Sequence, residues 1–501
     1  MKTFLQNMED FENRTFTVNG CVTLRSSLNA NVDMFGQASA MRYRPEKALT
    51  LFTKAWEEDA NLAIRNLFYL RDVRGGQGER NIFRMCSRWL ADMVSNETFE
   101  EFIAYIPEYG RWDDVIDVYA YMLNSTDVRM NYTGKIEAVY RLLQKQFSED
   151  MKAHSEDKSI SLLAKWFPLA NNTRNIAQKK VAKTLSKVLF GSEVDARKVV
   201  VALRKHLNVL EQKLSKNEWE AVEYSTVPSC ANKKYTKAFY KHDGDRYRSF
   251  IEAVNNGEVK MKAGTLYPYE IVLKAGCDRN GREWDAMWKS LPDYTDGKSA
   301  ICVVDVSGSM GGLSYTSVYP IHVALSLGLY FAERNEGQFK GKFFTFSHNP
   351  HIVTVKGNTL YERLYNMCRA DWGMNTNIER VFDLYLKLAK ESKVTTCPDS
   401  LIIISDMEFD EASDANKTMF ENIKRKFANE GIKVPNLVFW NVNASGKNVP
   451  VRYDEYGTVL VSGCSPSTFQ YVMNGKTPEE FMLDVLNGMR YSSINVFKRG
   501  E

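Results

Sequence analysis

The sequence predicts a chain of more than one domain, in which an all-α region of helical repeats precedes a doubly wound α/β domain. At 501 residues the chain is too long for one ordinary hydrophobic core. Apolar residues recur at three- and four-residue spacing from about Pro45 to Leu291, and after that short apolar runs alternate with helical stretches. We therefore expect an N-terminal arm over residues 1–30, a helical domain over 31–296 and an α/β domain over 297–501.

The helical region begins with a pair of amphipathic helices between Leu49 and Leu70. Gly75 to Gly78 interrupt this pattern, and a further helix starts near Ile82. Helix pairs repeated in this way are typical of a solenoid of HEAT-like repeats rather than of a compact bundle.

A glycine-rich segment, residues 71–78, could form a phosphate-binding loop. No strand precedes it and no Gly-Lys-Thr ending follows it, so a P-loop is not indicated. An interhelical turn is favoured instead, with Arg71 and Arg74 paired to Asp72 or Glu79.

The pattern of apolar residues changes after residues 291–298, which have the composition of a linker. Four apolar runs are predicted as strands: 300–305, 343–347, 401–406 and 437–441. Three amphipathic stretches are predicted as helices: 320–334, 377–393 and 415–429. The alternation predicts a parallel sheet that binds ligands at the carboxyl ends of its strands.

Composition points to a globular protein outside the membrane. Hydrophobic residues make up 44% and charged residues 26% of the chain. The longest apolar runs are far shorter than the ~20 residues that cross a bilayer, and the N-terminus has no secretory signal. The eight cysteines show no Cys-x-x-Cys spacing, so a zinc site is not expected. We expect a cytoplasmic protein with no membrane partner.

Oxygen-bearing side chains follow three predicted elements of the α/β region. Asp305, Ser307 and Ser309 form an Asp-x-Ser-x-Ser turn after the first strand, Thr376 precedes a helix, and Asp406 ends a later strand. Such a set of oxygen atoms suits one hard cation, and Mg²⁺ is favoured over Ca²⁺ or Mn²⁺. The alternative is that the two serines cap a helix while Asp305 accepts hydrogen bonds from loop amides.

This pattern resembles the metal-ion-dependent adhesion site of von Willebrand factor A (vWA) domains. Asp305, Ser307 and Ser309 match its first motif, Thr376 its second and Asp406 its third. The resemblance implies a cation with one position open for an acidic group of a protein partner. Two features depart from the pattern: Asn375 and Asn377 flank Thr376 as alternative ligands, and Glu408 and Asp410 crowd the third motif.

The helical region, followed by such a domain, resembles the TROVE-domain architecture of Ro autoantigens, and more closely a family joining a TROVE-like to a vWA-like domain. The segments that carry the resemblance are residues 68–80, 109–114, 227–232, 235–239 and 266–271, with Tyr267 in place of a histidine. The resemblance implies a ring of helical repeats closed by the vWA domain. It also implies binding of single-stranded RNA ends in the ring and of small structured or misfolded RNA on its surface.

Positive charge is concentrated in the helical region. Residues 171–250 contain 17 Lys or Arg against 8 Asp or Glu. The candidate RNA contacts are Arg174, Lys179, Lys180, Lys183, Lys187, Lys233, Lys234, Lys237, Lys241 and His242. Lysines at helical spacing beside aromatic side chains neutralise phosphates and stack bases. The alternative is an ordinary solvated helix surface.

The leading hypothesis is a ribonucleoprotein component that binds RNA through the ring and a protein through the metal. The second hypothesis is a protein-interaction scaffold without RNA. Catalysis is not expected, because a hydroxyl-rich single-ion site lacks an evident general base and His242-Asp243 has no nucleophile motif beside it. DNA is not expected as a partner.

Overall fold

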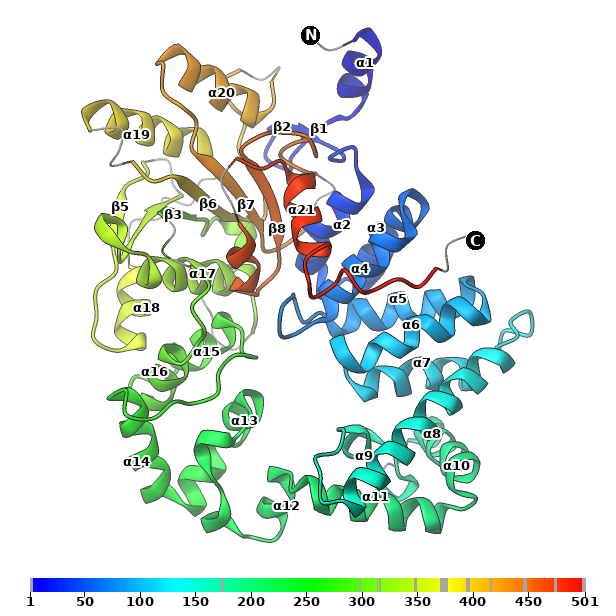
Figure 1. Ribbon diagram of the computed structural model, residues 1–501. Coiled ribbons are helices and arrows are strands. Elements are labelled where there is room, and N and C mark those ends of the chain that lie inside the picture. The colour runs from blue at the N-terminus through cyan, green and yellow to red at the C-terminus, as the bar shows by residue number, and fades with distance from the viewer. Residues whose placement is uncertain are drawn as a thin grey trace.

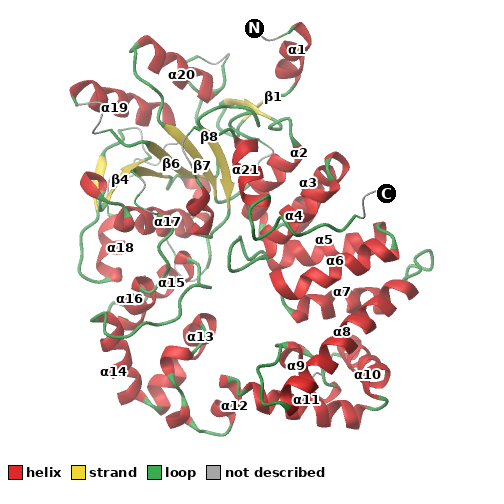
Figure 2. Cartoon of the chain, in the orientation of Figure 1, coloured by secondary structure: helices red, strands yellow, loops and turns green. Residues whose placement is uncertain are grey.

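The helices form a ring that is closed by an α/β domain (Figure 1). The structure is a computed structural model and describes residues 3–172, 175–295, 297, 299–312, 314, 317–346, 349–369, 377–392, 397–414, 417–444, 448–472 and 475–497. Helices dominate the described residues, and a large sheet lies in their C-terminal part (Figure 2). The predicted succession of a helical region and a sheet-containing region is confirmed.

The N-terminal residues pack against the C-terminal sheet region. Helix α1 (Phe4–Glu12) precedes an antiparallel hairpin of β1 (Arg14–Phe16) and β2 (Val22–Leu24). Helix α2 (Ala30–Gln37) and the 3₁₀ helix η1 (Ala38–Met41) follow, and α2 packs on the last strand of the large sheet. The ring therefore begins beside the domain that closes it.

The helical array runs from α3 to α16. Its first helices are α3 (Pro45–Glu58), α4 (Ala60–Arg71), α5 (Arg80–Met93), α6 (Asn96–Tyr109), α7 (Trp112–Asn124) and α8 (Thr133–Ser155). The next are α9 (Leu163–Trp166), η2 (Ala170–Asn172), α10 (Ile176–Phe190), α11 (Glu193–Leu207) and α12 (Leu210–Ser215). The last are η3 (Trp219–Ala221), η4 (Tyr224–Thr226), α13 (Ser229–His242), α14 (Gly244–Asn255), α15 (Pro268–Ala275) and α16 (Arg282–Lys289).

Local sequence explains the helix boundaries. Pro45 starts α3, where its missing N–H is not needed. Asp59 has an extended backbone and its side chain accepts a hydrogen bond from the Leu62 amide, so it ends α3 and caps α4.

Within the described residues, the C-terminal sheet has six strands in the order β5-β4-β3-β6-β7-β8. They are β3 (Ala300–Val304), β4 (Lys342–Thr345), β5 (Ile352–Thr354), β6 (Ser400–Ser405), β7 (Asn436–Asn441) and β8 (Thr458–Ser462). Of the strands that the structure describes in this sheet, β5 alone is antiparallel to its neighbour. The order reverses between β3 and β6, and this switch point is where doubly wound sheets bind ligands.

Helices accompany this sheet. They are η5 (Gly308–Met310), α17 (Pro320–Arg334), η6 (Gly337–Phe339), α18 (Leu360–Cys368), α19 (Ile378–Glu391), α20 (Met419–Asn429), η8 (Pro466–Tyr471) and α21 (Pro478–Leu486). The four predicted strands and three predicted helices of this region are confirmed to within a few residues. Strands β5 and β8 and helices α18 and α21 were not predicted.

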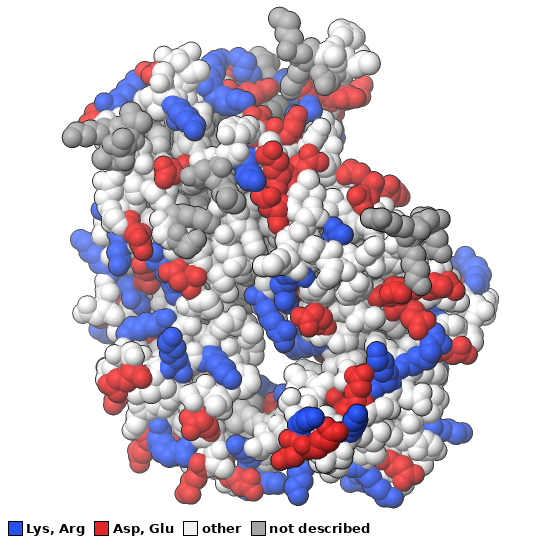
Figure 3. Space-filling view, viewed as in Figure 1, with Lys and Arg blue, Asp and Glu red and all other residues white. Residues whose placement is uncertain are grey.

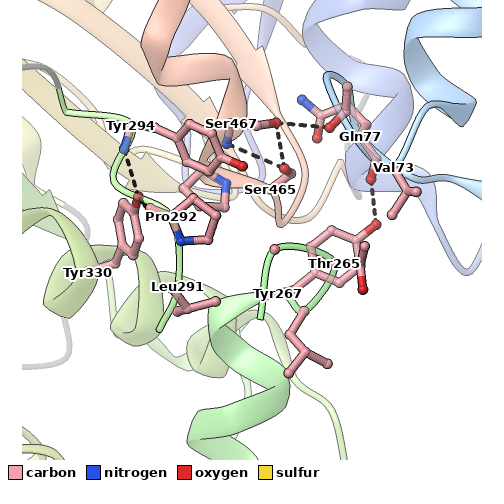
Figure 4. A pocket seen from close by; sticks show the side chains of 14 residues that line it. Val73, Gln77, Thr265, Tyr267, Leu291, Pro292, Tyr294, Tyr330, Ser465 and Ser467 are labelled. Atoms are coloured by element: carbon pink, nitrogen blue, oxygen red, sulfur yellow. Dashed lines mark hydrogen bonds between the residues drawn. The ribbon is translucent and has the colours of Figure 1, made fainter. Parts of the chain in front are cut away.

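The ring closes at the glycine-rich loop between α4 and α5. The Ser467 hydroxyl donates to the Gly76 carbonyl at 2.9 Å, and the Tyr267 hydroxyl, at the start of α15, donates to the Gln77 carbonyl at 2.6 Å (Figure 4). A Cβ atom at Gly76 would lie 2.0 Å from the Tyr69 carbonyl oxygen, so no other residue fits there. One loop thus joins the beginning of the helical array, its end and the α/β domain.

The turn was predicted correctly, but the predicted ion pairs within it are wrong. Arg71 pairs with Asp114 at 2.7 Å, and Arg74 lies 3.9 Å from Glu108. Asp72 and Glu79 instead bind distant arginines: Arg490 for Asp72 and Arg42 for Glu79. The Asp72 carboxylate also accepts from the Arg74 amide at 2.9 Å and the Gly75 amide at 3.3 Å, so it supports the turn as well as binding Arg490.

The ring surrounds a hollow that is visible in the space-filling view (Figure 3). Helix α13 borders it on one side, and α7 to α9 lie on the other (Figure 1). None of the described helices is long and apolar enough to cross a bilayer.

Candidate metal centre and basic helices

The sheet brings together the first and third predicted metal motifs. Strands β3 and β6 are parallel neighbours, with Val304 beside Ile404. The Asp305 amide donates to the Ile404 carbonyl at 3.0 Å, which continues the pairing to the ends of both strands. Asp305 and Asp406 therefore lie at the switch point of the sheet.

Hydroxyl groups surround the Asp305 carboxylate, which is fully buried. Its Oδ1 accepts from the Ser307 amide at 2.8 Å, and its Oδ2 accepts from the Ser405 hydroxyl at 2.6 Å. The Ser307 and Ser309 hydroxyl oxygens lie 3.1 Å apart. The Ser309 hydroxyl lies near enough to Asp406 to lower the pKa of that carboxylate, so the predicted residues Asp305, Ser307, Ser309 and Asp406 form one cluster.

Burial disfavours the charged forms of both carboxylates, and at Asp305 the charge of Asp406 adds to this effect. Burial, and then the charge of Asp406, raises the pKa of Asp305 to about 7. Burial also raises the pKa of Asp406. The Asp406 Oδ1 accepts from the Glu408 amide at 3.2 Å, but its buried Oδ2 has no hydrogen-bond partner among the described residues. A cation bound here would satisfy this oxygen and offset the repulsion that Asp406 exerts on Asp305.

The donor set fits a hard divalent cation. Carboxylate and hydroxyl oxygens are the ligands that Mg²⁺, Ca²⁺ and Mn²⁺ accept. Among the described residues no group of three or more His, Cys, Asp and Glu is arranged to hold a metal, so this candidate rests on two carboxylates with serines. Thr376 and Asn375 lie outside the described residues. Asn377 caps α19 by accepting from the Arg380 amide at 3.2 Å.

The helix-capping alternative for the serines is not supported. Ser307 stands at the N-cap of η5 but makes no side-chain capping hydrogen bond there. The alternative also expected Asp305 to accept hydrogen bonds from loop amides, and Asp305 does accept one, from the Ser307 amide.

Glu408, which crowded the third motif in the sequence, does not join the cluster through a hydrogen bond of its side chain. Its buried carboxylate accepts from the Val18 amide at 2.7 Å and from the Asn448 side chain at 3.0 Å. The Thr17 hydroxyl donates to the Phe409 carbonyl at 2.7 Å. The N-terminal hairpin thus fixes the loop that carries Asp406, through a hydrogen bond across 390 positions that sequence spacing could not reveal.

The structure separates the predicted basic residues into two groups. Lys179, Lys180, Lys183 and Lys187 lie exposed on α10, on the opposite side of the hollow from α13 (Figure 1). The Lys180 ammonium donates to the Leu123 carbonyl at 2.9 Å, and Lys183 lies 3.9 Å from Glu193. Arg174 lies outside the described residues.

The second group lies on α13. Lys233 pairs with Glu270 and is half-buried, whereas Lys234 lies 4.7 Å from the Tyr235 ring centroid. Lys237 and Lys241 are exposed, and neither has an ion-pair partner within the described part of the chain. The His242 ring stacks on Trp219 with centroids 4.4 Å apart and planes at 5°. Tyr235, Phe239 and Tyr240 share this helix.

Two family models match the chain. The family model described as "Domain of unknown function (DUF2828)" matches residues 17–95 and 118–298, which is more than half of the chain. The chain belongs to the DUF2828 family. A second model, "Domain of unknown function (DUF7788)", matches residues 299–490 of this DUF2828 protein, so the two matches meet close to the predicted boundary near residue 296.

One relative covers nearly all of the DUF2828 chain. It is "Uncharacterized protein L728" of Acanthamoeba polyphaga mimivirus, 29% identical over 508 residues that span 95% of this chain and 87% of the relative. The alignment therefore extends through both the helical ring and the α/β domain. The names of the two families and of the relative specify no ligand, and the TROVE and vWA resemblances stay predictions.

Proposed function

We propose that this DUF2828 protein is a binding protein whose α/β domain holds a divalent cation and binds an acidic group of a protein partner through it. The observation that carries the proposal is the buried Oδ2 of Asp406, which has no hydrogen-bond partner among the described residues, beside the buried carboxylate of Asp305. Mg²⁺ is the favoured ion, ahead of Ca²⁺ and Mn²⁺. The vWA-like order of motifs and the switch-point position support the same assignment.

Each residue of the cluster has a distinct task. Asp406, Ser307 and Ser309 would supply oxygens to the ion, while Asp305 is oriented by Ser405 and the Ser307 amide and adds the second negative charge. The bound ion would provide an electrophilic position for a partner's carboxylate. Thr376 is the predicted ligand from the second motif.

Ser309 allows a test that spares the fold, because its side chain is exposed. Titration calorimetry with MgCl₂ should show weaker binding for Ser309→Ala than for the parent. Ser317→Ala, an exposed serine in the following loop, is the matched control and should bind Mg²⁺ as the parent does. Equal affinity in all three proteins would remove Ser309 from the site, and a parent that binds no Mg²⁺ would remove the proposal.

We further propose that the helical ring binds RNA, which makes the protein a ribonucleoprotein component. Lys237 and Lys241 on α13, which have no ion-pair partner among the described residues, favour this role together with the half-buried rings of Tyr235 and Tyr240. Phe239 of the same helix is buried and belongs to the core. The hollow that α13 borders (Figure 3), and the resemblance to TROVE domains, support it too.

Salt dependence distinguishes lysines that bind phosphate from solvated lysines. Neutralising Lys234, Lys237 and Lys241 to glutamine should weaken RNA binding and lower the slope of log K against log salt by roughly 0.7 for each phosphate group that the variant no longer neutralises. An unchanged slope would take α13 out of the RNA site. A parent that binds no RNA at low salt would favour the second candidate, a protein-interaction scaffold.

A further inference from the structure

A cavity of about 680 Å³ lies among helices α13, α14, α15 and α16. Its volume falls within the range of small-molecule sites, which is roughly 300–1,000 Å³. Six cationic side chains from all four helices line it: Lys233, Lys234, Lys237, Arg248, Lys274 and Arg282. The carboxylates that line it are Glu252, Asp278 and Glu283. The cavity therefore carries an excess of positive charge.

Four of the six cations contact a partner side chain, among them Lys233, which pairs with Glu270, and Lys234, which lies 4.7 Å from the Tyr235 ring centroid. Arg248 lies 2.7 Å from Asp245, and Arg282 lies 3.5 Å from Glu252. Lys237 on α13 and Lys274 on α15 are exposed, and neither has an ion-pair partner among the residues the structure describes. An anion bound in the cavity would therefore meet two ammonium groups that no carboxylate of the described residues neutralises.

Aromatic side chains form another part of the wall. Tyr240 is half-buried and its hydroxyl donates to the Glu283 carboxylate at 3.0 Å, while Trp284 is 7% exposed. This hydrogen bond fixes Tyr240 in place, so its ring is a preorganised surface for a planar group. Glu252 and Asp278 are exposed and present acceptor oxygens for hydroxyl or amino groups.

We propose that this cavity binds a nucleotide, either free or as one unit of single-stranded RNA. Lys237 and Lys274 bind the phosphate, the aromatic wall of Tyr240 and Trp284 contacts the base, and the carboxylate side accepts from the sugar hydroxyls. In its RNA form the inference rests on the proposed RNA-binding role of the ring. It adds residues of α14, α15 and α16 that the basic segment in the sequence did not include.

The test uses the full chain and a pair of charge-reversed variants. Lys237→Glu with Lys274→Glu changes the cavity, and Lys145→Glu with Lys152→Glu changes two exposed lysines of α8 by the same charge. Binding of a fluorescein-labelled oligouridylate is measured by anisotropy, and binding of UMP, AMP and uridine by calorimetry. We expect the cavity variant to lose at least tenfold in affinity, the α8 variant less than twofold, and uridine to bind at least tenfold more weakly than UMP.

The outcomes separate the cavity from the RNA role. UMP binding without oligouridylate binding identifies a free nucleotide as the ligand and overturns the RNA role. Oligouridylate binding without binding of free UMP or AMP identifies the polymer. Oligouridylate binding that is unchanged in the cavity variant overturns the cavity and leaves the RNA role standing. Equal losses in both variants, or no binding of any probe by the parent, also overturn the cavity.

Discussion

Replacing Asp305 by asparagine should stabilise the metal-free protein and abolish its stabilisation by magnesium. Asp305 is fully buried beside Asp406, and its pKa is raised from 3.8 to about 7. A shift of roughly three units corresponds to at most about 4 kcal/mol of unfavourable free energy in the charged folded state above pH 7. Asparagine removes the charge and keeps an oxygen to accept from the Ser307 amide.

Magnesium should stabilise the parent but not Asp305→Asn, and so should offset the advantage in stability that the variant has without metal. At a free concentration 100 times its Kd, a ligand that binds only the folded state stabilises it by about 2.7 kcal/mol. For a domain of this size that corresponds to a rise in Tm of roughly 5–10 °C. We expect this rise in the parent at pH 8 when EDTA is replaced by MgCl₂, and little or no rise in Asp305→Asn.

The assay is thermal unfolding followed by circular dichroism in EDTA and in MgCl₂. Glu411→Gln is the control, because this exposed carboxylate belongs to the loop that follows Asp406 and should leave both effects at parental size. An equal magnesium effect in Asp305→Asn and the parent would refute the assignment of the cluster. A metal-free variant that is markedly less stable than the parent would refute the electrostatic part of the reasoning.

Three further predictions concern pH and ring closure. The metal-free protein should lose stability as pH rises from about 4 through 7, because the pKa of Asp305 is higher in the folded than in the unfolded state. The contribution of Asp305 to stability is complete only below the pKa that it has in the unfolded chain. Urea titrations in EDTA at several pH values measure this, and a flat profile would count against it. Gly76→Ala should destabilise the protein by several kcal/mol, on the order of 3 or more, since a Cβ there meets the Tyr69 carbonyl oxygen at 2.0 Å; a parental Tm would contradict this close approach. Arg490→Ala leaves the buried Asp72 without its cation and should lower the free energy of unfolding by about 3 kcal/mol. Faster proteolysis at the glycine-rich loop between α4 and α5 is the second readout, and unchanged proteolysis would show that this pair does not hold the ring closed.

Much of the architecture followed from hydrophobic periodicity, and the exceptions have physical reasons. Strands β3, β4, β6 and β7 have mostly buried apolar residues and were predicted, whereas β5 is a three-residue edge strand with exposed positions and gives no such signal. Strand β8 is fully buried like β3, but a threonine and a serine at its ends leave only a short apolar run, which was not recognised as a strand. Helix pairing indicated a repeat array, and the TROVE resemblance supplied the expectation of a ring.

The candidate site was predictable where its residues follow strand ends and not where distant segments meet. Asp305, Ser307, Ser309 and Asp406 come together because two adjacent parallel strands deliver them to one edge. The hairpin that holds Glu408 comes from the other end of the chain, so no local sequence pattern predicts this contact. The ion pairs of the glycine-rich loop were assigned wrongly for the same reason.

The basic segment illustrates a different limit. Composition located the excess charge, but the chain turns through the ring between α10 and α13, which places the two lysine groups on opposite sides of the hollow (Figure 1). Lys274 and Arg282 lie outside the segment in sequence and line the same cavity as Lys237. Spatial clustering of charge therefore depended on the helical topology.

The most direct test of the central claim is a crystal structure of the full chain grown with MnCl₂, with anomalous scattering used to locate the ion. If the cluster binds the ion, one anomalous peak should lie at the carboxyl ends of β3 and β6, within about 2.5 Å of oxygens from Asp406, Ser307 and Ser309. A peak elsewhere with this cluster empty, or no peak at a saturating manganese concentration, would contradict it.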